Sequence, residues 1–184
     1  CDPFLTRPWT HSTRASLWLQ DIPSAVETGR KALETLPEDN HWVTRSLVLA
    51  LAQSGRSDEA RRMALHRLRA ENEKLIALFM IAASRGDVEA TVELQQKFLA
   101  TYGPNDSVSL IMEAVRGNRS EANRLAGVID SRPSGHLSLL QSVFWCTCGI
   151  PFDLEATPKF SGMLLESGLP WPPENPLNFP LKNW

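Results

Sequence analysis

Residues 41–60 read HWVTRSLVLALAQSGRSDEA, a largely apolar run that leads through a polar turn at Gly55 into a second, more charged run. Apolar and small residues before and after the turn recur every three or four positions, which is the spacing of one helical face. Before the glycine these are Leu47, Ala50, Leu51 and Ser54, and after it Ala60, Met63, Ala64 and Leu68. The stretch therefore predicts two helices joined by a tight turn.

The same unit recurs along the chain. A Ser-Ala or Glu-Ala pair returns at intervals of 35, 30, 32 and 34 residues, at Ser24-Ala25, Glu59-Ala60, Glu89-Ala90, Glu121-Ala122 and Glu155-Ala156. A glycine in a polar turn shortly precedes three of these pairs, at Gly55, Gly86 and Gly117. We expect Ser57, Ser120 and Thr157 to cap helices, and Pro37, Pro104 and Pro133 to end them. No stretch alternates with the two-residue period of a strand, so the sequence predicts an all-α fold of about five helix pairs.

These residues resemble the tetratricopeptide repeat (TPR) family. Leu47, Ala50, Leu51, Gly55 and Ala60 match its signature positions, and the period of about 34 residues is that of the family. Residues 29–40 are similar to the end of a second TPR helix. The resemblance covers about residues 6–134 and is weaker in the third and fourth units, where the consensus aromatic positions are mostly lost. It implies a right-handed α-superhelix with a concave surface.

The last unit departs from the family pattern. Residues 150–158 contain a proline-bearing loop where a TPR has a tight turn. Residues 157–170 are similar to the segment that closes the helical-repeat regions of bacterial transcriptional regulators and cyclase-like proteins. This second resemblance implies an alternative function, a sensor or regulatory module of a longer regulator.

The C-terminal residues are rich in proline and aromatic side chains. Between residues 170 and 184 there are five prolines, with Trp171, Phe179 and Trp184 among them. The prolines exclude a helix, and the aromatic residues argue against a solvated disordered tail. Either this segment packs on the final helices as an extended cap, or it presents a polyproline-like strip to a partner. We favour the cap, which gives a tether at 1–8, a TPR-like domain at 9–169 and a cap at 170–184.

The TPR resemblance also implies where a partner binds. In that family the first helix of each pair lines the groove, which directs Trp18, Trp42, Arg45, Gln53, Ile76, Met80 and Ile111 inward in this chain. Ile76, Met80 and Ile111 fit an ordinary core between repeats equally well. The positions where some family members carry Lys and Asn to clamp a peptide carboxylate hold Arg45 and Leu49 in one unit and Ile76 and Met80 in the next, so no such clamp is expected. The groove would instead suit an amphipathic helix or an extended apolar segment of a partner protein.

Composition and charge favour no nucleic acid or membrane partner. The chain has 184 residues, 42% of them apolar, and its 19 basic and 21 acidic residues give a formal charge of −2. That balance leaves no overall electrostatic footprint for nucleic acid or anionic lipid. A basic cluster on the second unit's outer helix, at residues 56–69, is interpreted as a solvated face, with contact to an acidic partner or to phosphate as the alternative. The longest apolar stretches, near residues 47–52 and 75–83, are too short to span a bilayer.

No catalytic pattern is present. His11, His41, His66 and His136 are scattered over separate segments, and neither a phosphate-binding glycine loop nor a nucleophile elbow occurs. His136 with Cys146 and Cys148 forms only an incomplete tetrahedral metal set. The sequence therefore predicts no enzyme, no metal and no cofactor, and favours a non-catalytic protein-protein interaction scaffold or adaptor.

The first residue bears on location. The sequence begins with Cys1, which is the residue that a lipoprotein signal peptidase leaves at the new N-terminus for lipid attachment. A lipidated Cys1 would tether the domain to a bacterial envelope, on the periplasmic side. In the other interpretation Cys1 is where a fragment of a longer chain starts, and the protein is cytoplasmic. We favour the first interpretation.

Overall fold

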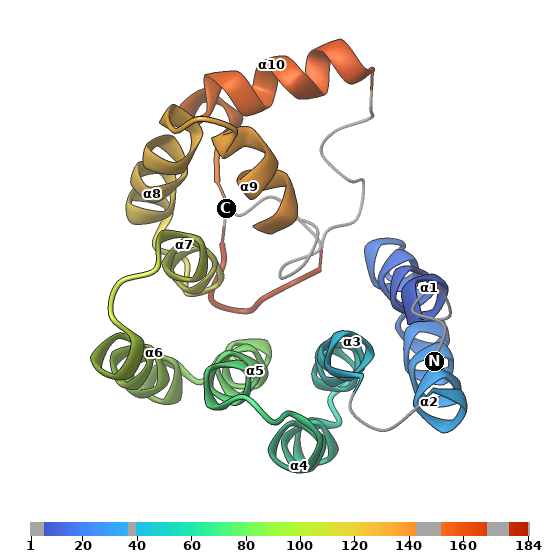
Figure 1. Cartoon of the computed structure of the whole chain (residues 1–184). Helices are drawn as coiled ribbons and strands as arrows, with labels where there is room; N and C mark the ends of the chain where they lie inside the picture. The colour runs from blue at the N-terminus through green and yellow to red at the C-terminus, as the bar shows by residue number, and fades with distance from the viewer. Residues whose placement is uncertain (1–5, 37–39, 143–151, 169–176, 184) are drawn as a thin grey trace.

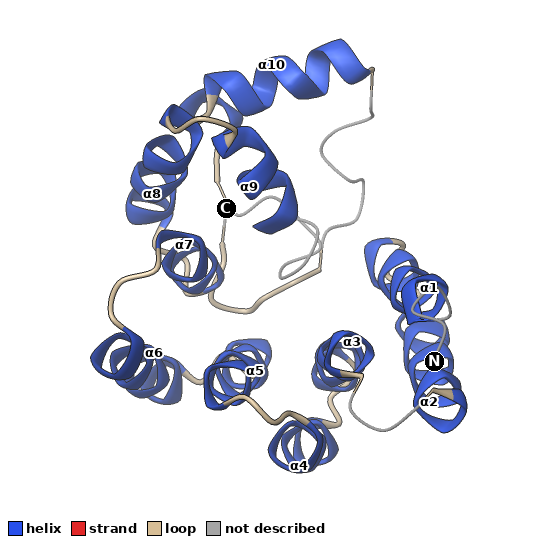
Figure 2. Cartoon of the chain, viewed as in Figure 1, coloured by secondary structure: helices blue, strands red, loops and turns tan. Residues whose placement is uncertain are grey.

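The structure is a computed structural model that describes residues 6–36, 40–142, 152–168 and 177–183. These ranges contain ten α-helices, a short 3-10 helix and no strand (Figure 2). The all-α class predicted from helical spacing is confirmed. The helices are α1 (Thr6–Trp18), α2 (Ile22–Thr35), α3 (His41–Gln53), α4 (Ser57–Arg67), α5 (Glu71–Ser84), α6 (Val88–Tyr102), α7 (Asp106–Val115), α8 (Arg119–Ser131), α9 (Gly135–Ser142) and α10 (Pro158–Ser167), with the 3-10 helix η2 at Leu154–Ala156.

The helices pack in consecutive pairs. Each odd-numbered helix contacts the even-numbered helix that follows it, and α3 also packs against α1, α2 and α5. In Figure 1, α3 to α8 follow one another round an arc, with α3, α5 and α7 on its inner side and α4, α6 and α8 on its outer side. Helix α1 begins at Thr6, three residues before the expected domain boundary at residue 9. Residues 1–5 of the expected tether lie outside the described residues.

The same kind of turn joins the two helices in each of the first four pairs. Its central residue has a positive φ, 77° at Gly55, 71° at Gly86 and 85° at Gly117, and the next amide donates to a carbonyl five residues earlier. This confirms the three glycine turns that the sequence predicts, because glycine adopts positive φ without a steric cost. The first pair has the same turn, with Gln20 at φ 56° and the Asp21 amide donating to Ser16. The sequence did not indicate this turn because Gln20 is not a glycine.

Two main apolar cores meet at α7. The larger, which we call the first core, contains buried residues of α1 to α6 and takes Ile111, Met112 and Val115 from α7. The second core takes Leu110 and Ala114 from α7 and continues through α8, α9, Phe152 and α10. Helix α7 therefore buries a different face in each core.

The packing of the array changes before α7. The backbones of α3 and α5 approach closely along their length, whereas those of α5 and α7 hardly approach each other. We call this place, between α5–α6 on one side and α7–α8 on the other, the seam. It divides the described chain into one block that runs from α1 to α6 and another that runs from α7 to α10.

Candidate protein-binding face

Most of the residues predicted to bind a partner lie on the inner helices of the arc. Trp42, Arg45 and Gln53 belong to α3, Ile76 and Met80 to α5, and Ile111 to α7, and we call these six residues the inner face. Trp18 lies at the end of α1, where it is half-buried and packs against both the first and the second core. The structure therefore brings the inner-face residues onto three helices, with Trp18 between the two cores.

At its amino-terminal end the inner face is aromatic and charged. The Arg45 guanidinium lies 5.7 Å from the centroid of the Trp42 ring, and Arg45 Nη1 is 4.0 Å from Glu73 Oε1 on α5. The Trp42 ring also lies against His41, with 4.6 Å between ring centroids. Both Trp42 and Arg45 are half-buried. This end therefore offers a cation over an aromatic ring, an arrangement typical of residues that dominate binding energy.

At the opposite end, Gln53 joins α3 to α5. Its Nε2 donates a hydrogen bond of 3.1 Å to Ser84 Oγ, and the Ser84 hydroxyl donates to the Met80 carbonyl at 2.9 Å. Gln53 is half-buried. In this structure Gln53 therefore positions the two inner helices against each other.

The apolar residues of the inner face are in the first core. Met80 and Ile111 are each 6% exposed, and Ile76 is partly buried against the same core. Of the two interpretations that the sequence left open, groove or core, this structure places the three residues in the core. That core, however, also contains Leu177 and Phe179 from the end of the chain.

Residues 177–183, which we call the C-terminal segment, lie inside the arc beside α7 (Figure 1). Leu177 and Phe179 are buried, while Asn178 and Pro180 between and after them are exposed. Over residues 177–179 this alternation is that of an extended chain with one side on a surface. A turn follows at Pro180 and Leu181, where the Lys182 amide donates to the Phe179 carbonyl at 2.9 Å. Residues 170–176 and 184 of the expected cap lie outside the described residues.

Two turns of the helix pairs form the surface beneath the C-terminal segment. A Cβ placed on Gly86, in the α5–α6 turn, would lie 3.3 Å from Pro180 Cβ. A Cβ on Gly117, in the α7–α8 turn, would overlap the carbonyl oxygen of Leu181. The segment therefore touches both sides of the seam.

An acidic group lies near the end of this segment. Asp153 accepts hydrogen bonds of 2.7 and 2.9 Å from the Arg119 guanidinium and one of 2.6 Å from Asn123. The Arg119 hydrogen bonds hold the pKa of Asp153 below its usual value. Burial lowers the pKa of Lys182, and the charge of Asp153 offsets part of that effect. Docking of the segment therefore partly desolvates a cation.

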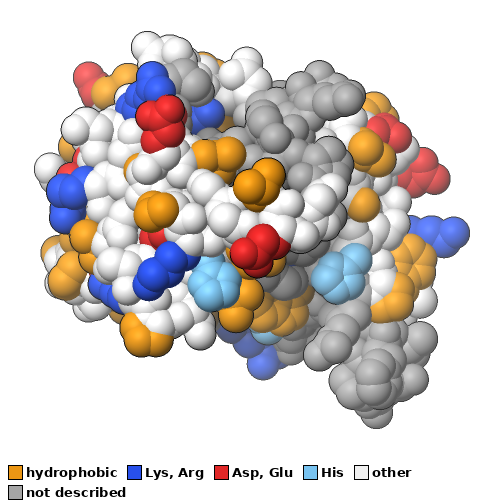
Figure 3. Space-filling model, turned by 90° about the horizontal axis from the view of Figure 1, so that it is seen from above, with side chains coloured by type: hydrophobic (Ala, Val, Ile, Leu, Met, Phe, Trp, Pro, Cys, Tyr) orange, Lys and Arg blue, Asp and Glu red, His pale blue; other side chains and the backbone are white. Residues whose placement is uncertain are grey.

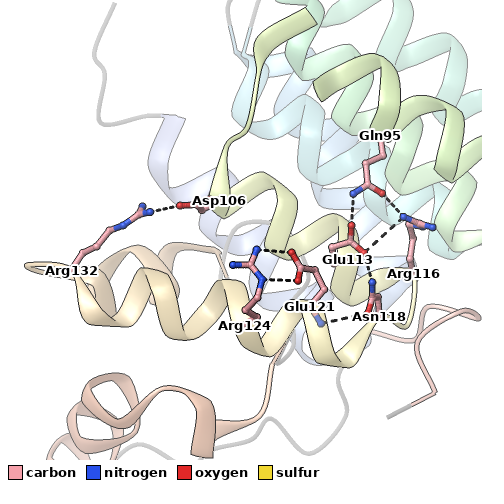
Figure 4. Close-up of polar contacts among 8 residues, drawn as sticks. All are labelled: Gln95, Asp106, Glu113, Arg116, Asn118, Glu121, Arg124 and Arg132. Atoms are coloured by element: carbon pink, nitrogen blue, oxygen red, sulfur yellow. Dashed lines mark hydrogen bonds and ion pairs between the residues drawn. The ribbon is translucent and has the colours of Figure 1, made fainter. Parts of the chain in front are cut away.

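A polar network joins α6 to α7 at the seam (Figure 4). Gln95 on α6 is buried, donates to Glu113 Oε1 at 2.6 Å and accepts from Arg116. Asn118 donates to the other oxygen of Glu113 at 2.9 Å. Within the second block, Arg124 pairs with Glu121 and Arg132 pairs with Asp106. The seam is therefore spanned by hydrogen bonds as well as by the side chains of the first core, although the backbones of α5 and α7 hardly approach each other.

A pocket and further ion pairs lie elsewhere on the described surface. A pocket of about 770 Å³ lies between α2 and the α3–α4 turn, where Arg30 and Arg56 both pair with Glu59. Figure 3 shows hydrophobic side chains scattered among polar and charged ones on the face seen from above.

No group of metal-binding side chains occurs among the residues that the structure describes; Cys146 and Cys148 lie outside them. In the same part of the chain, no helix is both long and apolar enough to span a membrane.

Comparison with known proteins identifies no family for this chain. No family model matches the sequence, and searches of curated proteins and of solved structures find no significant match.

Proposed function

We propose that this protein is a non-catalytic scaffold that binds an extended segment of a partner protein on the inner face of a TPR-like superhelix. The observation that carries the proposal is the C-terminal segment, which is extended over residues 177–179 and places Leu177 and Phe179 in the same core as Met80 and Ile111. A surface that accepts one extended apolar chain has the shape and chemistry to accept another. In this proposal the segment is also the cap that covers the inner helices.

The amino-terminal end of the inner face would supply specificity. Trp42 and Arg45 are half-buried and combine a large aromatic surface with a charge. Residues of these two types dominate binding energy at many interfaces. Attachment to a bacterial envelope through Cys1 stays a prediction, since Cys1 lies outside the described residues, and so does the alternative of a regulatory module in a longer protein.

The test uses site-specific photo-cross-linking in cells that make the protein naturally. A benzoylphenylalanine in place of Trp42 should cross-link a partner, and the same probe in place of Arg62, exposed on the outer helix α4, should not. With that partner purified, Trp42→Ala and Arg45→Ala should each weaken binding about tenfold or more, whereas Arg62→Ala should not. Circular dichroism should show an unchanged helical content.

Two results would contradict this proposal. One is cross-linking from the outer position alone. The other is an unchanged affinity in both the Trp42 and the Arg45 variant.

A further inference from the structure

We propose that the seam is a binding site for segments that extend through an aliphatic residue, any residue and an aromatic residue and then turn at a proline, and that the C-terminal segment is its exchangeable built-in occupant. This inference rests on the proposed function, because it names the kind of partner segment that the inner face takes. The pattern is that of Leu177, Asn178, Phe179 and Pro180.

The pattern follows from which side chains are buried. Phe179 is 2% exposed and Leu177 6%, whereas Asn178 points to solvent. Recognition of extended peptides commonly places alternate side chains in pockets. The aliphatic and aromatic positions therefore carry the recognition, and the position between them is free to vary.

Besides these side-chain positions, the glycine turns require a close approach of the ligand backbone. Gly55, Gly86 and Gly117 have the same turn geometry, and a Cβ on Gly55 would meet nothing within 4 Å. Of these three turns, the two on either side of the seam lie against residues 177–183, Gly86 beside Pro180 and Gly117 beside Leu181. At Gly117 the missing side chain makes room for a peptide backbone as well as permitting the turn.

Two features make exchange more favourable than a vacant site. Met80 on α5 and Ile111 on α7 share their core with the segment, so removing it exposes apolar surface unless another chain takes its place. The segment also partly buries Lys182, a desolvation that the charge of Asp153 offsets only in part, so its docking carries an unfavourable contribution. A partner segment with the same apolar pattern and no cation at that position would avoid this contribution.

The direct test offers the segment back to the protein as a peptide. The probe is a fluorescein-labelled peptide of residues 174–184, ENPLNFPLKNW, and its control carries serine in place of Leu177 and Phe179. The full-length double variant Leu177→Ser/Phe179→Ser keeps the site but weakens its own occupant. By fluorescence anisotropy it should bind the probe at least tenfold more tightly than the wild-type chain, whose tethered segment competes at an effective concentration near the millimolar range.

A matched pair of glycine variants checks the location. Added to the double variant, Gly117→Ala should weaken probe binding at least tenfold, because the new methyl group occupies the place of the Leu181 carbonyl. Gly55→Ala introduces the same backbone strain at φ 77° but touches nothing, so it should leave binding unchanged. The proposal is overturned if the folded double variant does not bind the probe, or if it binds the serine control equally well. It is also overturned if Gly117→Ala and Gly55→Ala have the same effect on probe binding.

A second design decides the question if the double variant does not fold. Cysteines in place of Gly86 and Pro180 have their Cβ positions 3.3 Å apart, near the separation of a disulfide. In a full-length chain with Cys1, Cys146 and Cys148 changed to serine, oxidation should lock the segment in place and abolish probe binding. Reduction should restore the weak binding expected while the chain's own segment competes. Equal binding in both states overturns the proposal, and so does a reduced chain that binds the probe no better than the serine control.

The outcomes separate this inference from the proposed function. If the probe fails but Trp42→Ala still weakens partner binding, the scaffold stands and the seam is not its site. If the probe binds but the Trp42 and Arg45 variants keep full affinity, the seam stands and the amino-terminal end of the inner face is not used. A wild-type dimer in light scattering that the double variant loses would place the occupant in a second copy and overturn the assignment within one chain.

Discussion

At the scale of single residues, helix capping shows what local sequence misses. We expected Ser57, Ser120 and Thr157 to occupy helix caps; the first two predictions are wrong, and only Thr157 stands at a cap position. Ser57 is the first residue of α4, and Ser120 lies inside α8, which Asn118 caps. Thr157 does precede α10, but its side chain makes no capping hydrogen bond.

The cap of α10 comes from another helix. Asp130, on α8, is 2% exposed and accepts hydrogen bonds from the Lys159 amide at 2.8 Å and the Phe160 amide at 2.9 Å. A carboxylate at a helix amino terminus satisfies amides that have no partner within the helix and interacts favourably with the helix dipole. Asp130 therefore joins two helices of the second block.

Replacing Asp130 tests this role. Asp130→Ala leaves two amides without their acceptor, and we expect it to lower the free energy of unfolding by about 2–3 kcal/mol in urea denaturation. The control is Asp87→Ala at the start of α6, where one hydrogen bond of 3.0 Å to the Ala90 amide is lost. That loss should be about 1 kcal/mol. Equal losses in the two variants would show that Asp130 is an ordinary cap.

At the scale of elements, the turn between paired helices is reused with different surroundings. The three glycines, 31 residues apart, share a positive φ that costs an L-residue about 1–2 kcal/mol. Only Gly117 would also place a methyl group onto a backbone oxygen of the C-terminal segment. The same residue type therefore serves the local turn at one position and both the turn and tertiary packing at another.

This difference predicts unequal effects of one substitution. Gly55→Ala should lower the free energy of unfolding by about 1–2 kcal/mol, from backbone strain alone. Gly117→Ala should cost about 1–3 kcal/mol more, because overlap with Leu181 forces the segment to shift. Urea denaturation of the full-length variants measures both. Equal losses would mean that the segment does not press on this turn.

At the scale of the whole molecule, the seam decides how the two blocks are joined. In a helical-repeat array, stability is approximately a sum of repeat terms and neighbour interfaces. Here the backbones of α5 and α7 hardly approach each other, and the two blocks are joined by the Gln95 network, the α7 residues of the first core and the C-terminal segment. The cooperativity of the protein therefore depends on a segment far from the seam in sequence.

Weakening that segment should uncouple the blocks. In Leu177→Ser/Phe179→Ser we expect the free energies of opening measured by hydrogen exchange to differ between the blocks, with one block opening more easily than the other. We also expect a broader urea transition with a smaller m value. Asn178→Ala, which changes an exposed residue of the same segment, should behave as the wild type. A single transition with an unchanged m value in the double variant would contradict this role of the segment.

The candidate site was predictable only where one helix determines it. Helical spacing and the TPR resemblance placed Trp42, Arg45 and Gln53 on one first helix, and they do lie on α3. The sequence could not say that Arg45 lies near Glu73 or that Gln53 bonds Ser84, because these partners lie about 30 residues away. An apolar stripe at helical spacing looks the same whether it faces a neighbouring helix, a ligand or the end of its own chain.

The sequence by itself determined the all-α class, the three glycine turns and the spacing of the helix pairs, because each depends on interactions within a few residues. Tertiary structure decided which distant residues those elements contact. It placed Met80 and Ile111 in a core with Leu177 and Phe179, gave α10 its cap from Asp130, and left the backbones of α5 and α7 hardly approaching each other. These features depend on residues distant in the chain, whose approach is set by the packing of every helix between them.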